Sequence, residues 1–278
     1  MSIGTNIRRY RALKGWSQEQ LAELLGVTFQ AISSWERDEY RPELDTFIRL
    51  TEVLEVPSTS IIEDKSVTFN TKDAIYSWEH MKTYVKTMAK TGNMDNTLKA
   101  VDFAAESHEG QMRKNTTVPY ICHPLTMACH ALAMGIREDE VIAAILLHDV
   151  IEESRKDMSK KAITFENLPV NARTRELVDL MTCPETTDEN RKEILDVYYA
   201  KLGEDPGGAL VKCIDRCNNL TTMSWGLRRE RIYRMIGETE HYYPELLKTV
   251  KKTPEYNDAA WLLQYQIESM LDIYKRLM

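Results

Sequence analysis

The stretch IAAILLHDVIEES, residues 142–154, combines the features of a buried helix with those of a reactive site. Its first six residues are apolar without interruption, which is typical of a helix that is covered on all sides. The apolar part ends directly in His148 and Asp149, and the pair Glu152-Glu153 begins three residues after Asp149. An imidazole and several carboxylates at the end of a dry helix are costly unless a positive charge compensates them. This stretch therefore predicts a helical domain that binds a cation.

Two other segments offer ligands that would complete such a site. His123 belongs to HEGQMRKNTTVPYICHP, residues 108–124, and Asp215 belongs to KCIDRCNN, residues 212–219. With the His-Asp pair they form a set of two nitrogen and two oxygen ligands, which suits Mn²⁺, the favoured ion, or Fe²⁺. Such a set leaves positions for water and for a phosphate oxygen. A closed zinc site would favour paired cysteines, and the five cysteines form no CxxC pair.

Each of these residues also has an ordinary explanation. His123, which precedes a proline, can be a helix-start residue with a satisfied side chain, and Asp215 can cap a helix or pair with Arg216. A lone His-Asp dipeptide is common by chance. Their occurrence together, in this order and with these neighbours, favours a metal site over coincidence.

Residues 1–65 have the pattern of several short helices. The segment SQEQ, residues 17–20, is a capping box in which the first and last side chains satisfy each other's end of a helix. Gly26 supplies a left-handed turn, and Thr28 is expected to cap the next helix. That second helix would bury Trp35 and turn polar side chains outward, which predicts a helix-turn-helix.

The chain as a whole is predicted to be all-α. Its 278 residues suffice for two cores, glycine (11) and proline (9) are sparse, and strand-like alternation is hard to find. We predict a small helix-turn-helix bundle over residues 1–65 and a linker with an amphipathic helix over residues 66–92. A larger helical domain that ends in a packing helix is predicted over residues 93–278.

Charge and cysteine content narrow the class of protein. The formal net charge of −7 argues against non-specific coating of nucleic acid, which needs concentrated Lys and Arg. Five cysteines without a disulfide pattern indicate free thiols in a reducing compartment, and the first residues hold no apolar signal segment. The longest apolar run, residues 141–147, is too short to span a membrane. A cytoplasmic protein is expected.

The segment SQEQLAELLGVTFQAISSWERDEYRPELDTFIRL, residues 17–50, resembles the Cro/repressor (XRE) family of DNA-binding proteins. The resemblance covers residues 3–57 and implies that the second helix of the motif enters the major groove. It places the following residues at DNA: Thr28, Phe29, Gln30, Ser33, Ser34 and Arg37, with Gln18 near the backbone. Residues 1–65 hold eight Lys and Arg against eleven Asp and Glu, so a role in dimerisation or protein contact stays open.

Three segments within residues 95–247 together resemble the hydrolase domain of RelA/SpoT-type alarmone enzymes, a branch of the HD superfamily. They are FAAESHEGQMRKNTTVPYICHPLTMACHALAMG, IAAILLHDVIEES and KCIDRCNNLTTM. The resemblance implies metal-dependent removal of the 3′ pyrophosphate from (p)ppGpp. The implied metal ligands are His123, His148, Asp149 and Asp215, and the implied substrate contacts are Arg113, Lys114, Tyr120, Asn219 and Thr222.

The acidic pair Glu152-Glu153 is implied to hold and deprotonate the attacking water. The family usually has Glu-Asp at these positions, so Glu153 keeps the carboxylate but displaces it by about one methylene. Misplacing a catalytic group by ~1 Å can cost on the order of a hundredfold in rate. The rate or the preferred substrate can therefore differ from those of the family.

Two other functions stay open. One is a transcription regulator whose HD-like domain senses a nucleotide with little catalysis. The other is a phosphatase for NADPH or another nucleotide with a 2′ or 3′ phosphate. A homodimer is expected because helix-turn-helix modules usually read two half-sites through two-fold symmetry. The last helix is expected to pack or dimerise through an apolar face of Trp261, Leu262, Tyr265, Leu271 and Tyr274.

Overall fold

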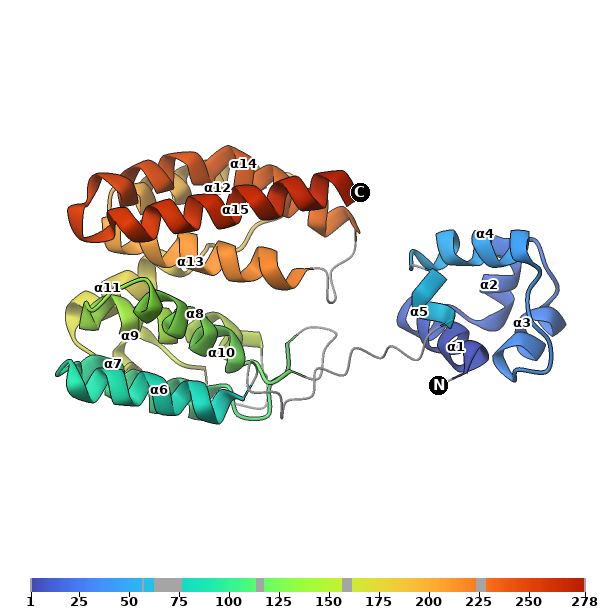
Figure 1. Cartoon of the computed structure of the whole chain (residues 1–278), viewed down its shortest axis with the longest axis horizontal. Helices are drawn as coiled ribbons and strands as arrows, with labels where there is room; N and C mark the ends of the chain where they lie inside the picture. Colours follow the sequence, from blue (N-terminus) through green and yellow to red (C-terminus); the bar gives the residue numbers. More distant parts are fainter. Residues whose placement is uncertain are drawn as a thin grey trace. The chain divides into compact units, whose positions relative to one another are not determined.

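The structure is a computed structural model that describes residues 2–56, 58–62, 77–113, 118–156, 162–223 and 229–277. The described residues are helical apart from turns, loops and one isolated β-bridge between Met112 and Pro119, which confirms the predicted all-α class. The chain divides into two compact units, Met1–Thr68 and Phe69–Met278 (Figure 1). Each unit has a hydrophobic core of its own.

The first unit is a bundle of five short helices. They are α1 (Ile3–Leu13), α2 (Gln18–Leu25), α3 (Phe29–Glu36), α4 (Leu44–Leu54) and α5 (Ser58–Ile62). The predicted capping box before α2 is confirmed, because Ser17 accepts from the Gln20 amide and the Gln20 side chain accepts from the Ser17 amide. Gly26 has a φ of 66°, the left-handed turn that glycine adopts without steric cost. Thr28 caps α3 through the amide of Ala31, so α2 and α3 form the expected helix-turn-helix.

A buried ion pair joins α1 to α3 in this unit. Arg11 donates from Nε to Glu36 Oε1 at 2.5 Å and from Nη2 to Glu36 Oε2 at 3.0 Å. The Gln18 amide donates to the same carboxylate at 2.6 Å. The Glu36 side chain is 3% exposed and that of Arg11 is 13% exposed. This hydrogen bond to Glu36 outweighs burial and raises the pKa of Arg11, so each charge stabilises the other.

The second unit contains ten α-helices among its described residues. They are α6 (Trp78–Thr91), α7 (Asp95–Ser107), α8 (Cys122–Ala133), α9 (Asp139–Leu147), α10 (Val150–Lys156), α11 (Ala172–Met181), α12 (Arg191–Gly203), α13 (Pro206–Thr222), α14 (Arg229–Lys252) and α15 (Asn257–Leu277). Two 3-10 turns, Phe165–Asn167 and Pro254–Tyr256, complete the described helical elements. α6, which begins inside the predicted linker, packs against α7 and α8.

The helix α9 lies at the centre of the second unit. It packs against α7, α8, α11 and α13, and its residues 141–147 are all buried. This burial on all sides matches the uninterrupted apolar sequence. Because α9 ends at Leu147, its C-terminal end carries His148 and Asp149 into the interior.

The helix α15 packs through a face that shares Leu271 and Tyr274 with the predicted one but not Trp261, Leu262 and Tyr265. Its buried residues are Ala259, Ala260, Leu263, Ile267 and Leu271, which pack in the core that α13 and α14 also form. Trp261 and Tyr265 are each 63% exposed, so they do not pack within this unit, and their role in a dimer stays a prediction. The sequence offers two apolar stripes on this helix, and the stripe with smaller and aliphatic side chains is the one that is covered. Of the helices that the structure describes, none combines the length and the hydrophobicity needed to cross a membrane.

Candidate metal centre and nucleotide contacts

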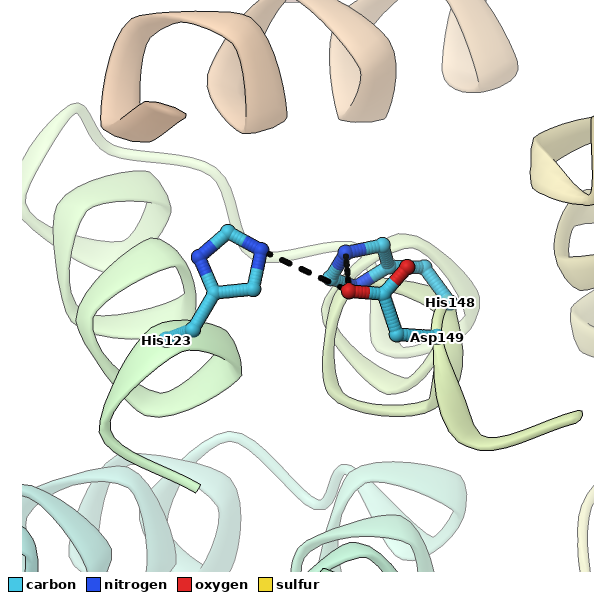
Figure 2. A group of neighbouring side chains, drawn as sticks. All are labelled: His123, His148 and Asp149. Atoms are coloured by element: carbon cyan, nitrogen blue, oxygen red, sulfur yellow. Dashed lines mark ion pairs between the residues drawn. The ribbon is translucent and has the colours of Figure 1, made fainter. Parts of the chain in front are cut away.

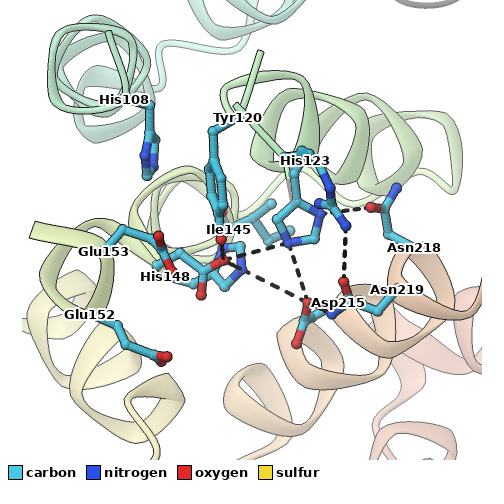
Figure 3. A network of polar contacts seen from close by, with 12 residues as sticks. His108, Tyr120, His123, Ile145, His148, Glu152, Glu153, Asp215, Asn218 and Asn219 are labelled. Carbon is cyan, nitrogen blue, oxygen red and sulfur yellow. Dashed lines mark hydrogen bonds and ion pairs between the residues drawn. The ribbon is translucent and has the colours of Figure 1, made fainter. Parts of the chain in front are cut away.

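Two helices and the junction between two others bring the four predicted metal ligands together. His123 lies in the first turn of α8, His148 and Asp149 join α9 to α10, and Asp215 lies within α13. Asp149 Oδ2 is 3.1 Å from His148 Nε2 and 3.6 Å from His123 Nε2 (Figure 2). Asp215 Oδ1 is 3.4 Å from His123 Nε2 and 3.9 Å from His148 Nε2 (Figure 3). Two nitrogen and two oxygen donors thus face one another.

Both imidazoles are oriented by a contact on the nitrogen that points away from this centre. His123 Nδ1 lies 2.6 Å from Asn218 Oδ1, and His148 Nδ1 lies 2.8 Å from the backbone oxygen of Ile145. An oxygen acceptor at Nδ1 places the proton there and leaves the lone pair of Nε2 for the centre, as in metal-ligating histidines. Among the described residues, the buried His148 Nε2 has no hydrogen-bond partner. The donor set and this orphaned nitrogen fit a divalent cation.

The two carboxylates of the centre contact different kinds of group. Asp215 Oδ2 accepts from Lys212 Nζ at 3.2 Å, which joins an ammonium to this carboxylate. Asp149 Oδ2 instead accepts from the Tyr120 hydroxyl at 2.6 Å and faces the two imidazoles. Burial lowers the pKa of His148, but the Asp149 carboxylate outweighs it and raises that pKa to about 9. The carboxylates therefore favour a positive charge on His148.

Four of the five predicted substrate contacts lie beside these ligands. Arg113 Nη2 donates to Asn219 Oδ1 at 3.3 Å and to Thr222 Oγ1 at 3.1 Å. Asn219 in turn donates from Nδ2 to Asp215 Oδ1 at 2.6 Å (Figure 3). The guanidinium carbon of Arg113 is 6.0 Å from the centre of the Tyr120 ring, so this aromatic side chain belongs to the same group. The predicted contact Lys114 lies outside the described residues.

The acidic pair on α10 shares one lysine. Lys156 Nζ lies 2.9 Å from Glu152 Oε1 and 2.6 Å from Glu153 Oε1. The Glu153 side chain is 21% exposed and that of Glu152 is 44% exposed, so Glu153 is the more enclosed of the two. Burial raises the pKa of Tyr120, and the charges of Asp149 and Glu153 add to this effect, which places Glu153 near the ligand cluster. Figure 3 shows both glutamates with the cluster.

His108 supports the aromatic wall of the centre. Its ring stacks on Tyr120 with centroids 4.7 Å apart, and its Nδ1 lies 2.8 Å from Gln111 Oε1. Burial lowers the pKa of His108 to about 4, so the ring is neutral near pH 7. These contacts give His108 a structural role beside the centre.

Sequence reasoning missed three side chains at the centre. Lys156, Lys212 and Asn218 were not singled out, although each contacts a predicted functional residue. Lys156 and Lys212 stand three or four residues from their carboxylate partners, and this helical spacing is a signal that can be read from sequence. Asn218 contacts a residue on another helix, and no spacing along the chain indicates that.

The predicted DNA-contacting residues lie in or beside α2 and α3. Thr28, Phe29, Gln30 and Arg37 are exposed, whereas Ser33, Ser34 and Gln18 are half-buried. Arg37 contacts the Ser33 hydroxyl and pairs with Glu39 at 2.8 Å. The Gln18 side-chain amide donates a hydrogen bond to the Glu36 carboxylate, so it also has a structural role inside the unit.

Comparison with known proteins gives matches for both units. A helix-turn-helix family model matches residues 7–61, and an HD-domain model matches residues 100–243, about half of the chain. A guanosine-3′,5′-bis(diphosphate) 3′-pyrophosphohydrolase of Aquifex aeolicus is 32% identical over 157 residues, which are 53% of this chain and 20% of that protein. The human pyrophosphohydrolase MESH1 is 33% identical over 129 residues, 46% of this chain and 69% of that protein. The bifunctional (p)ppGpp synthase/hydrolase SpoT of Escherichia coli is 27% identical over 177 residues, 62% of this chain and 24% of that protein.

Proposed function

Because the chain belongs to the HD-domain family and carries a helix-turn-helix domain before it, we propose that it is a metal-dependent hydrolase that removes the 3′ pyrophosphate of (p)ppGpp. The observation that carries this proposal is the cluster of His123, His148, Asp149 and Asp215 beside Arg113 and Asn219. The names of the relatives agree with it, although the chain spans only about a fifth of the length of the Aquifex protein. The polar group around Arg113 suits a phosphorylated substrate because guanidinium groups bind phosphate oxygens in pairs of hydrogen bonds.

The four ligands would hold Mn²⁺, with Fe²⁺ as the second choice for such a donor set. The bound ion would lower the pKa of a water molecule and polarise a phosphoryl oxygen. Glu153, with Glu152 beside it, would hold the attacking water and accept its proton. Arg113 and Lys114 would offset phosphate charge, and Asn219, Thr222 and Tyr120 would position the nucleoside. Lys156, which pairs with both glutamates, would fix their separation.

The test is the release of pyrophosphate from ppGpp, and of phosphate from NADPH, with Mn²⁺ present. Wild type should release pyrophosphate, and Asp149→Ala should lose on the order of a thousandfold in rate because several kcal/mol of charge stabilisation disappear. Asp102→Ala is the control, since that carboxylate lies on α7 and pairs with Lys82 and Lys86 instead.

Release from NADPH alone would keep the hydrolytic centre and replace the substrate. Binding of ppGpp without consumption would overturn the enzyme and leave a nucleotide-sensing regulator. Glu153→Asp, which restores the acidic pair usual in the family, tests the role of the longer side chain. An unchanged rate in that variant would show that the extra methylene does not misplace the carboxylate.

We further propose that the helix-turn-helix unit binds DNA through α3. Support comes from the exposure of Phe29, Gln30 and Arg37 on or directly after this helix. DNA selected from a random pool by the wild-type protein supplies the ligand for the test. Gln30→Ala should weaken binding to the selected sequence by about 1–3 kcal/mol, as expected for loss of a base contact. Glu23→Ala, an exposed change on α2, is the control. Failure to select any sequence would favour a protein-contact role for this unit.

We also propose a cytoplasmic homodimer. The exposed Trp261 and Tyr265 on α15 supply apolar surface for a second copy of the chain. A strictly monomeric mass by sedimentation, with and without the selected DNA, would rule the dimer out.

The five cysteines all lie among the described residues and form no disulfide, which supports the reducing compartment that a cytoplasmic protein would occupy.

A further inference from the structure

The two imidazoles of the metal centre are held by supports of different kinds. His148 Nδ1 contacts the backbone oxygen of Ile145, a group that every residue at that position provides. His123 Nδ1 contacts the side-chain oxygen of Asn218, which comes from another helix (Figure 3). The orientation of His148 therefore follows from the end of α9, whereas that of His123 depends on one side chain.

The contact with Asn218 determines which nitrogen of His123 carries the proton. Asn218 Oδ1 can only accept, so at 2.6 Å it favours a proton on Nδ1. Two carboxylate oxygens, Asp215 Oδ1 at 3.4 Å and Asp149 Oδ2 at 3.6 Å, lie near Nε2 and favour the opposite tautomer. Only the tautomer that Asn218 favours presents a lone pair to a cation. The Asn218 oxygen thus favours the metal-binding tautomer of His123, whereas the two carboxylates favour the other tautomer.

Because His123 is buried, loss of its partner at Nδ1 should change which tautomer the imidazole adopts. The His123 side chain is 2% exposed, so water cannot replace a lost partner at Nδ1 without rearrangement of the core. Asn218 lies on α13, three residues after the ligand Asp215 and directly before Asn219, which donates to Asp215. One turn of α13 therefore supplies a ligand, a support for that ligand and a support for the ligand on α8.

We propose that Asn218 is a positioning residue that fixes the metal-binding tautomer of His123 and thereby sets the affinity of the centre for its cation. This inference rests on the proposed metal site and adds a residue that controls it. Partners of metal-bound histidines typically change metal affinity by about 10–100-fold when they are removed. The same size of effect is expected here, because the imidazole would otherwise have to change tautomer and orientation before it binds.

The experiment measures Mn²⁺ affinity, by electron paramagnetic resonance of free Mn²⁺, in three variants of the full chain. Asn218→Leu removes the acceptor with little change in volume and should weaken Mn²⁺ binding by about 10–100-fold. Asn218→Asp keeps an acceptor and should bind at least as tightly as wild type. Thr221→Val is the control on the same helix, since among the described residues its hydroxyl contacts the Cys217 carbonyl and Met270 and none of the ligands.

A second readout does not depend on metal or on variants. Imidazole nitrogen-15 shifts of the metal-free wild type should show His123 protonated at Nδ1, and protonation at Nε2 would overturn the proposal. In the affinity measurement, the proposal would be overturned if Asn218→Leu bound Mn²⁺ as tightly as wild type, or if Asn218→Asp weakened binding as much as Asn218→Leu. If Asn218→Leu does not fold, the nitrogen-15 result and the Asn218→Asp affinity still decide. Wild-type protein that binds no divalent cation would instead reject the proposed function itself.

Discussion

Each unit of the chain buries charged side chains, but the two units balance that charge differently. In the helix-turn-helix unit, Glu36 is met by Arg11 through two hydrogen bonds, and Gln18 occupies a further lone pair. In the second unit, Asp149 is met by a hydroxyl and two imidazoles, and His148 is drawn towards protonation. The charge of Glu36 is balanced by a cationic side chain of the same unit, whereas a bound cation would balance the charge of Asp149.

The contrast suggests a way to separate structural from functional buried charge. A buried carboxylate with a guanidinium partner and satisfied oxygens holds helices together, and its removal should affect stability. The Asp149 carboxylate, which faces imidazoles instead, raises the pKa of His148, and such perturbed groups mark candidate binding sites.

The balanced pair should matter most when one partner is lost. Glu36→Leu leaves the Arg11 guanidinium nearly buried without its counter-charge, and should lower the free energy of unfolding of the first unit by about 3 kcal/mol. Hydrogen exchange of amides in α1 and α3 measures this change. Glu39→Gln removes an exposed partner of Arg37 and should leave exchange unchanged. Equal effects of the two variants would show that the buried pair does not hold the unit together.

Added metal should stabilise only the second unit. At Mn²⁺ about a hundredfold above its dissociation constant, linkage predicts a gain of about 2.7 kcal/mol. Exchange in α8, α9 and α13 should slow, while exchange in α1–α5 should not change. A gain spread over both units, or confined to the first, would contradict the assignment of the cation to the His-Asp cluster.

A proton should partly substitute for the metal, so Mn²⁺ binding should tighten as pH rises. Because Asp149 raises the pKa of His148 from 6.5 to about 9, its proton stabilises the metal-free fold fully below pH 6.5, and this contribution is lost as pH rises through about 9. Metal binding displaces that proton, so affinity should increase about tenfold per pH unit from roughly pH 7 to 8.5. Titrations at three pH values measure the slope. A flat profile would mean that His148 is already neutral in the metal-free protein.

The elements that sequence could predict are those specified locally. The capping box at Ser17 and the cap at Thr28 involve side chains within three residues of the backbone that they satisfy, and the turn at Gly26 depends on the backbone freedom of that one residue. The buried helix before His148 was likewise readable, since an apolar run without a polar face has to be covered. The grouping of the four predicted ligands followed from the cost of burying charge, and from the resemblance.

The features that sequence did not predict depend on how helices meet. Asn218 gains its role because α13 approaches α8, and Arg11 gains its role because α1 lies against α3. On α15 the spacing allowed two apolar stripes, and only the packing with α13 and α14 decides that Leu263 is covered while Trp261 is exposed. Such choices need the partner surface, which one helix's periodicity does not contain.

The central position of α9 has a consequence for biosynthesis. Its apolar residues 141–147 leave the ribosome well before α13, which begins at Pro206 and covers part of them. At ~5–20 residues per second, the roughly 60 residues in between take about 3–12 s to synthesise, and during this time the segment lacks its full cover. A helix that is fully buried in the finished domain is thus an aggregation hazard during translation. Slower initiation or a lower growth temperature, which reduces the number of such nascent chains present together, should increase the yield of folded protein.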